Sequence, residues 1–171
     1  ASGLFACNAV LASLFARERS GRGQRIDISL LDCQLALMSY VASNYLVSGE
    51  PPKRYGNAHP NIVPYEVFRG SDDYFAFAAG NDAQWGKFCR QVGHADWAAD
   101  PRFATNPARL ENRAVLVGLL NELFAGRPVA EWLALCEQIG LPAGPINSID
   151  RVLADPQILA RGMRLEVAHA T

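Results

Sequence analysis

The sequence carries almost no net charge. Lysine and arginine total 16 residues, aspartate and glutamate total 17, and the formal net charge at pH 7 is −1. Proteins that bind nucleic acids need a basic patch to neutralise phosphates, and this chain has no basic excess and no arginine or lysine cluster that forms a stripe. The charge balance therefore argues against a nucleic-acid partner. Hydrophobic residues make up 50% and charged residues 19%, which is typical of a folded protein and not of a disordered chain.

Long apolar runs and closely paired cysteines are also lacking. The hydrophobic segments are short and interrupted by polar residues, which predicts no membrane span. The first residues, ASGLFACNAVLASLFARERS, have no basic head, which argues against a signal peptide. The cysteines are scattered and form no C-x-x-C pair: Cys7, Cys33, Cys89 and Cys136. Such spacing predicts reduced thiols and no metal site, in the cytoplasm or, as the alternative compartment, the mitochondrial matrix.

The first 48 residues show helical and strand periodicity in turn. Apolar residues recur at helical spacing over 4–15, and Ser2 is a candidate N-cap. The segment QRIDISL, residues 24–30, alternates between apolar and polar side chains and predicts a strand. A second helix is expected over 31–47. Helix, strand and helix in quick succession predict part of an open α/β sheet, whose strand finds no neighbour within the segment itself.

Composition changes at SGEPPKRYGNAHPNIVP, where four prolines and two glycines fall within one short stretch. Proline and glycine at this density are typical of a loop, and we expect a linker and lid loop over 49–63. The following segment, YEVFRGSDDYFAFAAG, predicts two strands joined by a short turn at Gly70 to Asp73. The loop therefore leads directly into a hairpin.

The rest of the chain is mainly helical. Helices are expected over 83–92, 107–124 and 129–139. Asn106, which precedes a proline, is the candidate N-cap of the middle helix. PAGPIN predicts a stiff connector into a short helix capped by Ser148, and MRLEVAHA at the end alternates as a strand. These elements predict a smaller α+β domain over 64–155 and a return segment over 156–171.

Several motifs together resemble one protein family. They are ASGLFACNAVLASLFARERSGRGQRIDISLLDCQ, GNAHPNIVPYEVF, AAGNDAQWGKFC, DPRFATNPARLENR and GLPAGPINSIDRVLADPQILARGM. In this order, and over essentially the whole chain, they resemble the class III coenzyme A transferases, the CaiB/BaiF family. The resemblance implies an α/β fold, with a partial Rossmann-like large-domain segment followed by the smaller α+β domain. Residues 1–48 would then be the C-terminal part of the large domain's first half.

The resemblance also implies a chemistry. The parent enzyme would be an acyl-CoA:carboxylate CoA-transferase that works through an aspartyl anhydride and an aspartyl-CoA thioester. In the family the nucleophilic aspartate comes just before a small-Gly-Leu turn, here Ser2-Gly3-Leu4, so it would fall before Ala1. We therefore expect the chain alone to be an inactive fragment. Coenzyme A would enter as acyl-CoA, a small carboxylic acid would be the second substrate, no metal is expected, and the intact protein would be an interlocked homodimer.

Two other functions stay open at this point. An α-methylacyl-CoA racemase of the same superfamily would move a proton with a His/Asp pair, and both members of that pair would lie upstream of this chain. A non-catalytic assembly module would keep the scaffold and lose the nucleophile. The loop NAHPNIVPYEVF is more similar to the transferases than to the racemases.

Four residues are candidates for substrate contact. The resemblance places His59 and Asn61 in a loop near the acyl group, with Tyr65 where the next strand begins. It places Leu30 at a position that lines the coenzyme A pocket. Each residue also has an ordinary structural interpretation. His59 would be a surface-turn residue and Asn61 a turn former, whereas Tyr65 and Leu30 would pack in a core.

Three polar residues on the helix expected over 107–124 have a different interpretation. Arg109, Asn112 and Arg113 share one face of that helix. We expect them to make structural polar contacts.

Overall fold

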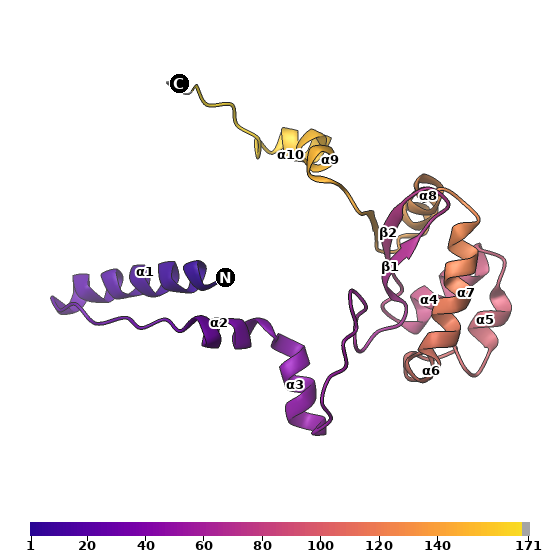
Figure 1. Cartoon of the computed structure of the whole chain (residues 1–171), viewed down its shortest axis with the longest axis horizontal. Helices are drawn as coiled ribbons and strands as arrows, with labels where there is room; N and C mark the ends of the chain where they lie inside the picture. The colour runs from indigo at the N-terminus through magenta and orange to yellow at the C-terminus, as the bar shows by residue number, and fades with distance from the viewer. Residues whose placement is uncertain (169–171) are drawn as a thin grey trace. The chain divides into compact units, whose positions relative to one another are not determined.

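The computed structural model describes residues 1–168 and separates into two units, Ala1–Arg54 and Tyr55–Thr171 (Figure 1). The first unit contains three helices: α1 (Ser2–Ser20), α2 (Leu30–Leu37) and α3 (Ser39–Ser48). Gly21 ends α1 in the left-handed conformation, with φ at 68°, and donates its N–H to the carbonyl of Arg17. A glycine is suited to this position because a Cβ would be strained there. Within this unit, which is fully described, only Cys33 is buried.

Three predictions for the first unit are wrong. The strand over 24–30 does not form, because none of the described residues of the unit offers a neighbouring strand to share its hydrogen bonds. The hydroxyl of Ser29 instead accepts the N–H of Asp32 at 3.2 Å and caps α2. Ser2 is not the N-cap of α1. It is the first residue of the helix, and Ala1 occupies the N-cap position. The helix over 31–47 divides at Met38 into α2 and α3.

The second unit contains a three-stranded antiparallel sheet in the order β1-β2-β3. Strands β1 (Tyr65–Arg69) and β2 (Tyr74–Ala78) form the predicted hairpin around the predicted turn. Strand β3 (Ala143–Pro145) pairs with β2, with Gly144 opposite Ala76. The sequence predicted a connector there, because three residues rich in proline and glycine carry no strand periodicity. Their pairing depends on the presence of β2.

Over residues 55–168, seven helices accompany the sheet. They are α4 (Asp82–Gln91), α5 (Ala95–Ala99), α6 (Asn106–Glu111), α7 (Arg113–Ala125), α8 (Val129–Ile139), α9 (Ile149–Ala154) and α10 (Pro156–Ala160). The helix predicted over 107–124 divides at Asn112, and Thr105 replaces Asn106 as its N-cap, accepting the N–H of Ala108. The final strand predicted over 163–170 does not form over 163–168, where no strand edge pairs with it, and its last two positions lie outside the described residues.

The core lies where the sheet meets α4, α7 and α8. Phe124 of α7 is fully buried at its centre. Its ring lies 5.0–5.8 Å, centroid to centroid, from five other aromatic rings: Phe68, Phe75, Phe77, Phe88 and Trp132. Aromatic side chains bury a large apolar area in such tilted and edge-to-face arrangements. This packing makes the sheet and helices a rigid base for the loop that precedes β1.

The hairpin turn is tied to the start of α8. The Asp72 carboxylate accepts the N–H of Val129 at 2.8 Å and that of Asp73 at 2.9 Å, so the turn satisfies a free donor of the helix. Gly70 lies so close that a Cβ there would come within 2.9 Å of the Val129 side chain. The aspartates are therefore structural, as their place in a turn suggests.

Candidate functional site

The loop between Tyr55 and Pro64 folds back onto the free edge of β1. The His59 N–H donates to the carbonyl of Tyr65 at 2.8 Å, and the Asn57 side chain accepts the N–H of Val67 at 2.9 Å. The imidazole of His59 also stacks on the Tyr65 ring, with centroids 5.2 Å apart and planes 14° apart. Backbone and ring contacts therefore attach the middle of the loop to the strand that follows it.

The hydrogen bond at the His59 ring determines its tautomer. The N–H of Asn61 donates to Nδ1 of His59 at 3.1 Å. A ring nitrogen that accepts a hydrogen bond carries no proton, so the neutral imidazole has its proton on Nε2. Burial, and secondly the positive charge of Arg113, hold the pKa of His59 below its ordinary value of 6.5. The ring is therefore a neutral Nε2–H donor at physiological pH.

Arg113, the first residue of α7, holds the same loop from the other side. Its Nη2 donates to the carbonyl of His59 at 2.7 Å and to that of Pro60 at 3.2 Å. The guanidinium lies over the Tyr55 ring, 5.6 Å from its centroid. Nη1 is 3.9 Å from a carboxylate oxygen of Glu66, and neither of these two buried atoms has a hydrogen-bond partner. Arg113 thus contacts the start and the middle of the loop and faces the strand at its end.

Glu66 lies in β1 with its side chain mostly buried beside Arg113. Burial raises the pKa of Glu66 above its ordinary value, and the charge of Arg113 offsets this only in part. Desolvation disfavours an ionised carboxylate. At 3.9 Å the pair interacts through charge alone, without a hydrogen bond.

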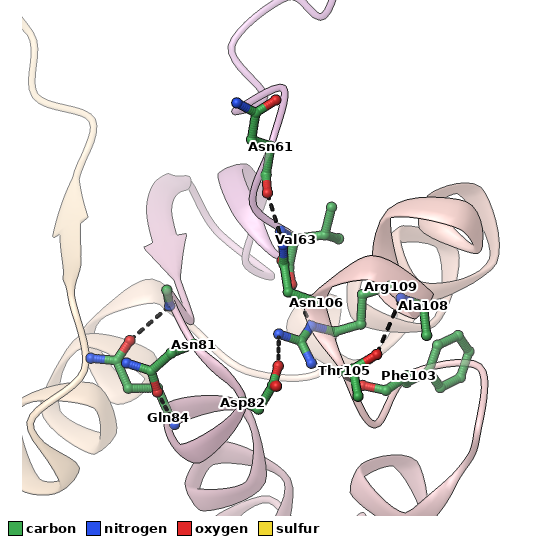
Figure 2. Close-up of polar contacts among 11 residues, drawn as sticks. Asn61, Val63, Asn81, Asp82, Gln84, Phe103, Thr105, Asn106, Ala108 and Arg109 are labelled. Carbon is green, nitrogen blue, oxygen red and sulfur yellow. Dashed lines mark hydrogen bonds and ion pairs between the residues drawn. The ribbon is translucent and has the colours of Figure 1, made fainter. Parts of the chain in front are cut away.

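The end of the loop is anchored on α6, as Figure 2 shows. The Asn106 side chain donates to the carbonyl of Asn61 at 2.8 Å and accepts the N–H of Val63 at 3.1 Å. Arg109 is fully buried and donates Nε to the carbonyl of Val63 at 2.6 Å. Its other two nitrogens bind the carbonyl of Phe103 at 3.0 Å and the carboxylate of Asp82 at 2.9 Å, which joins three segments.

The structure brings three of the four predicted site residues together. His59 and Tyr65 are in ring contact, and Asn61 is bonded to the His59 ring. The Tyr65 ring is 45% exposed and is not a core residue, which corrects its structural interpretation. Leu30 belongs to the first unit, where it begins α2 with 72% of its surface exposed. It is likewise not packed in a core within that unit.

Arg109 and Arg113 both make structural polar contacts, as expected for this helix face. The contacts of Arg113 also involve the candidate site. The backbone that Arg113 binds is that of the candidate site residues. Sequence reasoning missed this connection because the two segments are 54 positions apart. No local pattern marks such a pair.

Tyr65 also lines a cavity of about 250 Å³ on the sheet. The other lining residues are mostly apolar or small: Ala76, Phe77, Ala78, Pro142 and Ala143. Tyr65 therefore contacts a polar donor, the His59 ring, and also lines an apolar cavity. This arrangement suits a ligand with a polar group and a short hydrocarbon part.

Two of the cysteines are buried deeply enough to change their acidity. Burial raises the pKa of Cys89 to about 12 and that of Cys136 to about 11, so neither supplies a thiolate nucleophile near neutral pH. Over residues 1–168, no three His, Cys, Asp or Glu side chains gather as metal ligands would. In the same part of the chain, no helix has the length and apolar character needed to cross a membrane.

Comparison with known proteins gives consistent matches. The family model described as CoA-transferase family III matches residues 1–171. A succinate–glutarate CoA-transferase from Agrobacterium fabrum is 42% identical over 97% of this chain and 42% of that protein. The succinyl-CoA:glutarate CoA-transferase of Mus musculus is 41% identical over 100% of this chain and 39% of that protein. A crystal structure of a CAIB/BAIF family protein from Brucella suis is 48% identical with a TM-score of 0.77, over 96% of this chain and 43% of that one. The chain thus spans about two fifths of the length of these relatives.

Proposed function

The chain belongs to CoA-transferase family III, and from this we propose that the protein transfers coenzyme A from an acyl-CoA to a carboxylic acid. The resemblance seen in the sequence motifs is confirmed, as is the mixed α/β fold class. The single observation that carries the proposal beyond the family is the loop over 55–65. It carries a neutral Nε2–H donor, His59, in a tautomer set by Asn61, and the His59 ring stacks on Tyr65, which lines an apolar cavity.

We propose a reaction through two covalent intermediates on an aspartate that, in the family pattern, precedes Ser2-Gly3-Leu4. The aspartate attacks the thioester carbonyl, a mixed anhydride forms, and the CoA thiolate leaves. The thiolate then attacks the aspartyl carbonyl of the anhydride, which releases the donor acid and leaves an aspartyl-CoA thioester. The acceptor carboxylate displaces the thiolate to form a second anhydride. The thiolate finally attacks the acceptor's acyl carbon, which yields the new acyl-CoA and restores the aspartate.

Each of these steps develops negative charge on a carbonyl oxygen. A fixed N–H donor stabilises such charge best when no reorganisation is needed at the moment of reaction. We assign this role, or the binding of the acceptor carboxylate, to Nε2–H of His59. Asn61 sets the tautomer and Tyr65 sets the plane of the ring. Leu30 is proposed as an apolar contact to coenzyme A, for which its exposure at the start of α2 leaves room.

The substrate class and assembly are part of the same proposal. The relatives from Agrobacterium fabrum and Mus musculus are named for succinate or succinyl-CoA and glutarate, so short dicarboxylic acids are the proposed carboxylates. The many exposed apolar side chains of the first unit favour a homodimer in the intact protein, in which a second chain covers them. All four cysteines are free thiols, which favours a reducing compartment, the cytoplasm or the mitochondrial matrix.

The full-length protein tests the proposal. It is incubated with succinyl-CoA and a panel of acids that includes glutarate and oxalate, and new CoA thioesters are identified by mass spectrometry. We expect glutaryl-CoA to form, and succinyl-CoA alone to leave a CoA adduct on one aspartate. A 2-methylacyl-CoA in deuterium oxide provides the contrast. Deuterium at its α-carbon without transfer would indicate a racemase, and neither reaction would indicate an assembly module.

A further inference from the structure

Arg113 contacts the candidate loop at its start and in its middle. It donates to two consecutive carbonyls, those of His59 and Pro60, from a single nitrogen. The central carbon of its guanidinium lies over the ring of Tyr55, where the loop begins. All three contacts belong to the ten residues that carry the proposed donor. The guanidinium therefore bridges the loop at the base of the His59 side chain.

We propose that Arg113 is a positioning residue for coenzyme A transfer, a role that rests on the proposed function. It holds the His59 and Pro60 carbonyls and so sets the direction in which the His59 imidazole points. Arg113 is the first residue of α7. The position of this helix is fixed because Leu116, Leu120 and Phe124 are fully buried in the core. The contacts with Arg113 therefore hold the loop in a defined position relative to α7.

The chemistry of the side chain fits this role. A guanidinium is planar, keeps its charge and offers donors in a rigid fork, whereas a lysine ammonium is a flexible point charge. One guanidinium nitrogen, Nη2, donates to both carbonyls, and the central carbon of the same group lies over the Tyr55 ring. A lysine would keep the charge and lose this combination. Arginine and lysine are therefore distinguishable here by experiment.

Charged and titratable groups approach the His59 ring from two elements and from the loop itself. Arg113 approaches from α7, Glu66 faces Arg113 from β1, Tyr65 stacks on the ring, and Tyr55 lies under the guanidinium. Burial in the held loop lowers the pKa of His59 most, and the charge of Arg113 lowers it further. Loss of Arg113 removes the effect of its charge and loosens the loop that contributes to the burial. The titration of His59 thus reports on the loop without any need for enzyme activity.

The first experiment titrates the histidines of the 171-residue chain by NMR. We compare wild type with Arg113→Met and Arg113→Lys, and use Arg90→Met, an exposed arginine of α4, as the matched control. In Arg113→Met the midpoint of His59 should rise and the amide signals of residues 57–61 should shift. In Arg113→Lys the amides should shift while the midpoint rises less. His94 is an internal reference, and the buried Trp132 indole N–H, bonded to the carbonyl of Phe124 at 2.9 Å, reports that the core is intact.

The second experiment measures transfer in the full-length protein. Arg113→Met should lower kcat by roughly 10- to 100-fold, the range expected when a catalytic group is misplaced, with a smaller change in KM for acyl-CoA. Combined with His59→Ala it should cause no further loss, because it acts through the same side chain. Arg90→Met should keep wild-type kinetics.

The outcomes separate the two proposals. An unchanged His59 midpoint together with unchanged amide signals in Arg113→Met would overturn the role of Arg113, as would additive losses in the double variant. Loss of the Trp132 indole signal would mean that the methionine variant is misfolded, and the lysine variant then decides by the same criteria. A full-length protein without any transfer would refute the proposed function and with it the catalytic role of Arg113, while the titration would still decide whether Arg113 holds the loop.

Discussion

The imidazole of His59 lies on the ring of Tyr65, with centroids 5.2 Å apart and planes 14° apart, and its backbone N–H donates to the carbonyl of the same tyrosine at 2.8 Å. One residue of β1 therefore contacts both the backbone and the ring of the histidine. The loop is attached to the sheet before any ligand arrives. A preformed loop loses little conformational entropy when a substrate binds.

Replacement of His59 in the full-length protein should affect turnover and leave folding nearly unchanged. His59→Ala removes one donor to a charged or partly charged oxygen, which is worth about 1–3 kcal/mol in transition-state free energy. The measurement is kcat for succinyl-CoA with glutarate, together with the melting temperature. His94→Ala, at the N-cap of α5, is the control and should keep its activity. Near-normal kinetics in His59→Ala would show that the loop only connects two parts of the chain and has no role in catalysis.

Arg109 should be among the most important residues for stability. Arg109→Met leaves the carbonyls of Val63 and Phe103 without their buried donor, and we expect a loss of about 3–5 kcal/mol in the free energy of unfolding. Urea denaturation of the chain measures it. Arg102→Met, which removes a pair with Asp100 on the surface, should cost far less. Equal losses in the two variants would contradict the assigned role of Arg109.

Gly70 should not accept a larger residue. In Gly70→Ala the new Cβ would lie 2.9 Å from a methyl of Val129 and 3.2 Å from the carbonyl of Arg127, so overpacking should cost about 1–3 kcal/mol of stability. Gly118→Ala is the matched control. Gly118 lies inside α7 with open space around it, so alanine there should stabilise by about 0.5–1 kcal/mol. Thermal unfolding should show a lower melting temperature for Gly70→Ala and a higher one for Gly118→Ala. A stabilised Gly70→Ala would refute the packing argument.

Glu66 should make stability depend on pH in a defined direction. Burial raises its folded-state pKa above the ordinary value of 4.5. Protonated Glu66 therefore favours the folded state, and this contribution is present below the unfolded pKa and is lost as pH rises through the folded pKa. As pH rises from the unfolded pKa through the folded pKa, Glu66→Gln should become increasingly stable relative to wild type.

Urea unfolding at a series of pH values from about 4 to about 8 measures this difference. Glu122→Gln, an exposed glutamate of α7, serves as the control for the loss of one negative charge. A stability difference that is constant with pH in Glu66→Gln would show that the folded protein does not perturb this carboxyl group.

The chain should self-associate through its first unit. Leu46 and Val47 of α3 are 80% and 90% exposed, and large apolar surfaces of this kind are covered in stable proteins. Sedimentation over a range of concentrations should show dimers or larger species. Changing both residues to glutamate should shift the population toward monomer. A wild-type chain that stays monomeric at all concentrations would contradict the prediction.

Local patterns in the sequence determined the parts of this protein whose structure depends on neighbouring residues. The turn at Gly70 to Asp73 between two aromatic-rich segments specified the hairpin, and Gly140 specified the end of α8, where it adopts a φ of 65°. Residue type alone sets the torsion angles and buried faces at such places. The ordered series of motifs was also sufficient to identify the family.

Only the tertiary structure decided which distant residues pair. The alternation of QRIDISL predicted a strand, yet a strand also needs a neighbour for its hydrogen bonds, and none exists among the described residues of its unit. The short β3 had no strand pattern and formed because β2 offered an edge. Arg113 reaches His59 across 54 positions, and Arg109 reaches Val63 across 46. Such contacts follow from the packing of the helices around the aromatic core, because a local pattern sets the face of a helix but not what that face will meet.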